Sequence, residues 1–144
     1  MASTTVAAGR MHRSWGIVQT YALVFGIAYL AVAILEVALG SNGLVVGGTV
    51  ILQVQLVQNI IHWAVGLAVL GSFFAGEKWA KLVARAVGLV FVLVTLLGLL
   101  VEPLTGQLLG FPGALPASYN IVHLLTAAAA LFAGFAAQRA YGRS

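Results

Sequence analysis

An asparagine and a histidine lie three residues apart twice in the chain, as Asn59-Ile60-Ile61-His62 and as Asn120-Ile121-Val122-His123. Residues three apart on a helix share one face. Both copies lie inside long apolar runs, where a polar side chain is costly unless it bonds to something. Imidazole can bond across helices, bind haem iron or zinc, or carry protons. These two histidines are therefore the first candidates for chemistry.

The elements that position these residues must be membrane helices. The chain has 144 residues, enough for one domain, and is 62% hydrophobic but only 7% charged. In soluble domains about a quarter of the residues are charged, so lipid must be the solvent for most of this surface. The basic residues are too few and too dispersed for a nucleic-acid interface. With no cysteine, disulfides and thiolate metal sites are excluded.

Four apolar runs are long enough to cross a bilayer, which takes about 20 residues. We predict a membrane domain over 15–139, cytoplasmic tails at 1–14 and 140–144, and spans at about 15–39, 53–75, 82–101 and 118–137. The first run exceeds the apolar region of a signal peptide, about 7–15 residues. The predicted fold class is all-α, an integral membrane four-helix bundle. Its two hairpins are predicted to form an internal repeat about an axis near the membrane normal.

The connections between the spans are less regular. Residues 40–43 are predicted to form a turn. Residues 44–52 fit either a re-entrant or interfacial piece or an early start of the second helix. Residues 76–81 are predicted to be a charged connector. Residues 102–117 hold all three prolines and are predicted to form a loop, after which Ser118 would cap the last span.

The basic residues predict the orientation of the bundle. In a four-span arrangement they all fall on one side: Arg10, Arg13, Lys78, Lys81, Arg85, Arg139 and Arg143. The positive-inside rule then places both termini in the cytoplasm. Interfacial aromatic residues fit the same arrangement, with Trp15, Trp79 and Tyr141 at the inner boundary and Tyr119 at the outer one.

Depth can be counted from the inner boundary at about 1.5 Å per residue. His62 then lies roughly 21 Å from that boundary and His123 roughly 24 Å, on parallel helices. Small and polar residues recur at spacings of three and four in each span, with Gly26 and Gly88 as candidate close contacts between helices. We therefore predict one polar cluster in the outer half of the membrane: Glu36, Gln55, Asn59, His62, Glu102, Tyr119, Asn120 and His123.

This cluster has several interpretations. Neutral histidines could hydrogen-bond between helices and specify their pairing. They could instead bind a b-type haem, zinc with Glu36 or Glu102, or a small polar or amphipathic ligand, and they could form a proton-linked site. No defined set of metal ligands is predicted, and no catalytic constellation is recognised, so we expect no enzyme.

The paired elements Asn59-Ile60-Ile61-His62-Trp63-Ala64-Val65-Gly66 and Asn120-Ile121-Val122-His123-Leu124-Leu125 resemble a prokaryotic family of small four-span membrane proteins, the DUF4383 type. Its members carry Asn-x-x-His-x-x-x-Gly in the second helix of each of two hairpins. The resemblance covers roughly residues 14–138 and implies the four-span fold and a prokaryotic inner membrane. It brings no catalytic residues. The second copy has Ala127 where the pattern has Gly, which puts identical packing of the two halves in doubt.

The predicted function is that of a multi-pass inner-membrane protein, either a structural or accessory bundle or a protein that binds or transports a small ligand, haem, quinone or metal. Its predicted partner is the lipid bilayer, and no nucleic acid is expected. The apolar faces suit lipid, a second copy of the chain or another membrane subunit equally.

Overall fold

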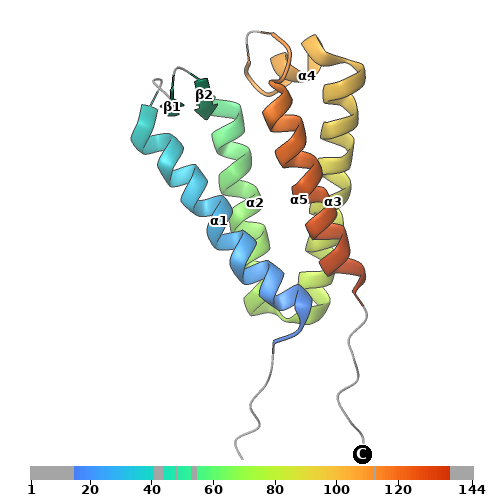
Figure 1. The fold of residues 1–144 in the computed structure, drawn as a ribbon. Coiled ribbons are helices and arrows are strands. Elements are labelled where there is room, and N and C mark those ends of the chain that lie inside the picture. Colours follow the sequence, from blue (N-terminus) through green and yellow to red (C-terminus); the bar gives the residue numbers. More distant parts are fainter. Residues whose placement is uncertain (1–14, 41–43, 48, 53–54, 112, 137–144) are drawn as a thin grey trace, which may run out of the picture.

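The computed structural model describes residues 15–40, 44–47, 49–52, 55–111 and 113–136. Its elements are α1 (Ile17–Leu39), β1 (Leu44–Val46), β2 (Thr49–Leu52), α2 (Leu56–Ala75), α3 (Glu77–Leu100), α4 (Glu102–Leu108) and α5 (Ala117–Phe135). The four long helices form a bundle (Figure 1), which confirms the predicted all-α fold class. The internal repeat remains a prediction.

The outer faces of the bundle are apolar. Leu56, Phe74 and Leu100 are each more than 75% exposed, and many other aliphatic side chains are about half exposed. Water would make such a surface unstable, whereas lipid is its natural solvent. Each of the four long helices is long and apolar enough to cross a membrane. Helices satisfy their backbone hydrogen bonds internally, as a bilayer requires.

The helices pack in two close pairs, α1 with α2 and α3 with α5. Glycine permits each close approach. A Cβ on Gly26 of α1 would lie 2.7 Å from the backbone nitrogen of Leu70, and one on Gly88 of α3 would lie 2.6 Å from Cγ of Leu131. Both glycines had been predicted as contact points between helices. The pairs diverge from each other toward the end that carries α4 and the strands (Figure 1). We call this end the α4 end.

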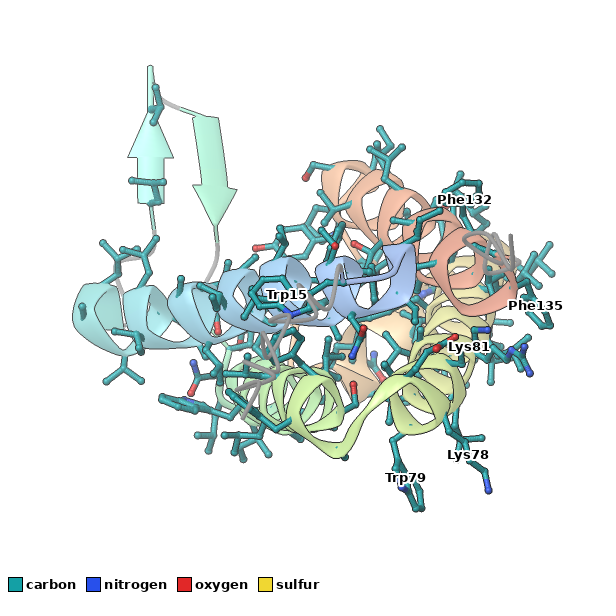
Figure 2. All side chains as sticks on the ribbon, turned by 90° about the horizontal axis from the view of Figure 1, so that it is seen from below. Trp15, Lys78, Trp79, Lys81, Phe132 and Phe135 are labelled. Carbon is teal, nitrogen blue, oxygen red and sulfur yellow. The ribbon has the colours of Figure 1, made fainter. Side chains whose placement is uncertain are left out.

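The opposite end, where α1 begins and α5 ends, carries the described basic residues, and we call it the basic end (Figure 1). Viewed from this end, Lys78 and Trp79 point away from the bundle (Figure 2). Arg85 turns inward instead: its Nε donates to the backbone oxygen of Gly134 at 2.8 Å, and its guanidinium carbon lies 4.5 Å from the centre of the Phe135 ring. The other predicted basic residues (Arg10, Arg13, Arg139 and Arg143) and Tyr141 lie outside the described residues.

The connector between α2 and α3 is shorter than predicted. Only Gly76 separates the two helices, and its φ of 99° favours glycine. The residues predicted as a charged connector form the first turns of α3 instead. Glu77 suits a helix N-terminus, and it pairs with Lys81 four residues on at 2.8 Å. These interactions explain why the charged stretch is helical.

Residues 44–52 are not an early start of α2, because their described part forms a two-stranded hairpin. Strands β1 and β2 pair antiparallel, with Leu44 opposite Leu52 and Val46 opposite Thr49. Gly47 supplies the positive φ of 58° for the turn. The β-branched residues of this stretch favour strands.

Two expectations about residues 102–118 are wrong. The helix break after α3 is present, but Glu102–Leu108 form α4, with Pro103 in its first turn. Proline is well tolerated there because the first amide groups of a helix have no intrahelical partner. Ser118 does not cap α5, because that helix begins at Ala117 and Pro116 occupies the cap position.

Candidate functional site

Glu36 is the centre of the polar contacts between α1 and α2. Its side chain is fully buried, with 0% exposure. Asn59 Nδ2 donates to Glu36 Oε2 at 2.8 Å and also to the backbone oxygen of Ala33 at 2.8 Å. A hydrogen bond of 3.0 Å joins His62 Nδ1 to the same Oε2. The other carboxyl oxygen, Oε1, has no hydrogen-bond partner among the described residues.

The spacing of Asn59 and His62 explains this arrangement. Residues three apart lie on one face of α2, and that face meets α1 one turn before its end at Leu39. Both side chains therefore reach one carboxyl group. This joins three residues of the predicted cluster directly.

His62 and His123 lie at matched depth. Each is the seventh residue of its helix, α2 or α5, so each lies roughly 9 Å along the axis from the helix start. Both side chains line one cavity of about 280 Å³ between the two hairpins. This cavity, which we call the central cavity, is lined by residues of α1, α2, α3 and α5.

Aromatic rings form much of the cavity wall, contributed by Phe25, Tyr29, Phe91 and Tyr119. The rings of Tyr29 and Phe91 are nearly parallel, with centroids 5.9 Å apart and an interplanar angle of 4°. Tyr29 lies 6.1 Å from the His62 ring, and Phe91 stacks on His123 at 5.3 Å. A row of four rings thus runs from one histidine to the other across the junction of the hairpins.

Three buried polar atoms of the cavity-lining residues have no hydrogen-bond partner among the described residues. They are the hydroxyl oxygen of Tyr29, Oε1 of Gln58, which is 5% exposed, and Nδ1 of His123, which is 8% exposed. An unpaired buried polar group costs about 1–3 kcal/mol. Most such groups in proteins are paired, so each exception needs an explanation. Here Gln58 and His123 bring two of the three exceptions to one cavity from opposite hairpins.

The cavity reaches the outer surface between α1 and α5. Ala28 of α1 and Val122 of α5 line it, yet both are exposed on the surface of the bundle, Val122 by 59%. That surface is apolar and suited to lipid. A molecule dissolved in the membrane would therefore meet the rim of the cavity directly.

The second motif makes different contacts. Asn120 Nδ2 donates to the backbone oxygen of Gly98 on α3 at 3.4 Å, while its Oδ1 has no partner among the described residues. Asn120 lines a separate cavity of about 430 Å³ at the α4 end, together with Thr95 and Glu102. Glu102 is exposed.

The predicted cluster is therefore divided. Glu36, Asn59 and His62 bond to one another, and His62, Tyr119 and His123 line the central cavity. Glu102 and Asn120 line the other cavity. Gln55 precedes α2, at the α4 end next to Gly110: a Cβ on Gly110 would lie 3.4 Å from the Gln55 Cβ.

Gln58, Tyr29 and Phe91 are among the cavity residues that the predicted cluster omits. Gln58 could have been found, because it is a polar residue inside a span and lies four residues before His62, on a shared helix face. Tyr29 lies on the small and polar stripe of the first span, three residues after Gly26, which predicts that it faces inward. Phe91 carries no such signal, since aromatic residues are common in any membrane helix.

The central cavity is small for a ligand pocket. Such pockets commonly measure about 300–1,000 Å³, and this one, at about 280 Å³, lies at the lower end of that range. For metals, no group of three or more histidine or acidic side chains occurs within the part of the chain that the structure describes.

Comparison with known proteins identifies the family but not an activity. A search of curated proteins and a search of solved structures found no match. A protein-family model described as a domain of unknown function (DUF4383) matches residues 19–136, most of the chain. The chain therefore belongs to the DUF4383 family, as its paired Asn-x-x-His elements predicted.

Proposed function

We propose that this protein binds a small, largely apolar molecule with a hydrogen-bonding group in its central cavity, within the membrane. One observation carries the proposal: Gln58 Oε1 and His123 Nδ1 are buried, unpaired among the described residues, and on the wall of one cavity. A ligand that bonded to them would remove the cost of leaving them unpaired. The aromatic wall would hold the apolar part of such a ligand.

The alternative is a structural or accessory bundle, and a different observation favours it. Asn59 bridges the Ala33 backbone and Glu36, which ties α2 to α1. Hydrogen bonds of this kind stabilise helix pairs in membranes. This role accounts for Asn59, Glu36 and His62. It leaves Gln58 and His123 unexplained, which is why binding is the better proposal.

We also propose that the protein lies in a prokaryotic plasma membrane with both chain ends in the cytoplasm. Lys78 and Lys81 lie at the basic end, where α1 begins and α5 ends. Trp15 and Trp79, which are 57% and 53% exposed, lie at this end too. Basic residues favour the cytoplasmic side, and tryptophan favours the membrane interface. The central cavity would then lie in the outer half of the membrane.

The test is to block the cavity and ask whether a bound molecule is lost. Ala28→Phe would place a ring at the rim of the cavity. Ala31→Phe is the matched control, because Ala31 is an exposed residue of the same helix that is not part of the cavity wall. Both variants and the wild type would be purified in nanodiscs, and bound small molecules would be extracted and measured by mass spectrometry.

We expect the wild type and Ala31→Phe to carry the same small molecule in near-stoichiometric amount, and Ala28→Phe to lose most of it. Identical extracts from all three proteins, with lipids alone, would refute binding and leave the structural bundle as the better explanation.

A further inference from the structure

The central cavity has room for more than water. An apolar cavity of about 150 Å³ can hold a benzene molecule, and this one measures about 280 Å³. A water molecule takes up about 30 Å³ and needs about two to four polar partners. Water bound to the few polar atoms of the wall would therefore leave most of the cavity unfilled. The volume suits an aromatic ring with a short chain.

The wall of the cavity favours an aromatic ligand. Phe25, Tyr29, Phe91 and Tyr119 line it, and the rings of Tyr29 and Phe91 stack on each other. Aromatic rings prefer offset-stacked or edge-to-face contacts, and such pairs gain free energy beyond the area that they bury. Among small apolar molecules, one with an aromatic ring therefore gains most from this wall.

The unpaired polar atoms of the cavity-lining residues determine which hydrogen-bonding group the ligand needs. Gln58 Oε1 is a carbonyl oxygen, which accepts hydrogen bonds and cannot donate them. It is buried without a partner among the described residues, so the ligand must supply a donor. His123 Nδ1 accepts in one tautomer and donates in the other, and the Tyr29 hydroxyl can do both. A hydroxyl group on the ligand suits all three, because it donates one hydrogen bond and accepts others.

The rim of the cavity indicates how the ligand lies. Ala28 and Val122 line the cavity and are also exposed on the surface suited to lipid. Gln58 and His123 are at most 8% exposed, so they lie inside the bundle. A ligand whose hydroxyl reaches these two residues holds its ring among the aromatic side chains. An alkyl chain on the opposite side of the ring then extends past the rim into lipid.

We propose that the central cavity selects alkylphenols, which are aromatic rings with a hydroxyl group and an alkyl chain, and takes them from the membrane. The hydroxyl donates to Gln58 Oε1, and the ring packs against the aromatic wall. The inference rests on the proposed binding function and names the chemical class of the ligand. It separates hydrogen-bond donors from acceptors, because an ether or a ketone leaves Gln58 Oε1 unpaired and binds more weakly.

The experiment compares three probes built on one ring. Para-propylphenol donates and accepts hydrogen bonds, para-propylanisole only accepts them, and para-propyltoluene does neither but matches the phenol in size. Binding of each to the wild type in nanodiscs would be measured by saturation-transfer NMR, with empty nanodiscs of the same lipid as the baseline. Affinity would be expressed relative to the concentration of each probe in the lipid, because the three probes partition into lipid differently.

We expect para-propylphenol to bind about tenfold more tightly than the other two probes, because only the phenol satisfies Gln58 Oε1. Gln58→Leu removes this acceptor and keeps a side chain of similar size, so it should reduce the preference for the phenol to less than about threefold. Gln55→Leu is the matched control, since Gln55 directly precedes the same helix and is not part of this cavity wall. It should keep the full preference.

Equal binding of the three probes, or tighter binding of the anisole than of the phenol, overturns the selection for phenols but leaves the binding function standing. A preference for the phenol that Gln58→Leu leaves intact overturns the role of Gln58. Binding of no probe above the baseline also overturns the inference, and the comparison of Ala28→Phe with Ala31→Phe then decides the binding function separately. The wild-type measurements decide the selection even if Gln58→Leu does not fold.

Discussion

The hairpin of α1 and α2 and the hairpin of α3 and α5 carry the same Asn-x-x-His spacing but bond it differently. In the first, Asn59 and His62 both reach the carboxyl group of Glu36. In the second, Asn120 reaches only the backbone oxygen of Gly98, and His123 Nδ1 has no partner among the described residues.

The two helices that face the motifs explain the difference. Tyr29 lies seven residues before Glu36 on α1, and Phe91 lies seven residues before Gly98 on α3. The two rings stack on each other, so Glu36 and Gly98 hold comparable places. A glutamate in the first hairpin is thus matched by a glycine in the second. A Cβ at Gly98 would collide with Oδ1 of Asn120, so this place cannot take a larger side chain without moving Asn120.

This difference shows that one sequence motif can serve two purposes in one bundle. Where a carboxyl group is present, the motif joins two helices. Where glycine replaces it, the histidine keeps a free ring nitrogen that faces a cavity.

The largest expected effect comes from removing Glu36. Glu36→Ala deletes the acceptor that serves Asn59 and His62, and it should lower the free energy of unfolding by about 3 kcal/mol. Glu102→Ala, which alters an exposed carboxylate, should leave stability unchanged. Unfolding would be followed by circular dichroism during titration of mixed micelles with SDS. If Glu36→Ala and Glu102→Ala lowered the free energy of unfolding equally, the hydrogen bonds of Glu36 to Asn59 and His62 would not stabilise the first hairpin.

Replacing each histidine by phenylalanine tests the asymmetry directly. His62→Phe leaves Glu36 buried with Asn59 as its remaining partner and should cost about 2 kcal/mol. His123→Phe preserves the ring contact with Phe91 and removes an unpaired nitrogen, so stability should be unchanged or slightly higher. If the two hairpins were equivalent, His62→Phe and His123→Phe would lower the free energy of unfolding by equal amounts. The same SDS titration would decide between the two outcomes.

The glycines at the helix contacts are expected to have effects of about the size of His62→Phe or smaller. Gly26→Ala meets the backbone of Leu70, which cannot yield without separating the helices, and should cost about 2 kcal/mol. Gly88→Ala meets the end of the Leu131 side chain, which can rotate, and should cost about 1 kcal/mol.

Gly71→Ala is the control for both glycine variants, because no atom lies within 4 Å of its added methyl group. It should raise stability by up to about 1 kcal/mol, since alanine is the better helix former. If Gly88→Ala proved more costly than Gly26→Ala, the first hairpin would not be the more tightly constrained of the two.

Much of the architecture could be predicted because the length and hydropathy of each local stretch of sequence identify a membrane helix. Length and hydropathy indicate four long helices, and the fold class predicted from them is confirmed. The family predicted from the paired Asn-x-x-His elements is confirmed as well. Element ends were predicted less well. The helical start of α3 at Glu77 depends on single charges, and the short helix α4 depends on one proline in its first turn. The effect of these few residues on the local backbone is too small to be recognised within a long apolar pattern.

The sequence by itself determined which face of each helix carries its polar residues and the matched depth of His62 and His123, because helix period and rise are fixed by the backbone. Only the tertiary structure decided that Glu36 meets His62, that Gly98 meets Asn120, and that Gln58 faces the same cavity as His123. These pairings depend on how each helix is rotated and tilted against its neighbour. Contacts between side chains far apart in the chain set that rotation, and no local pattern records it.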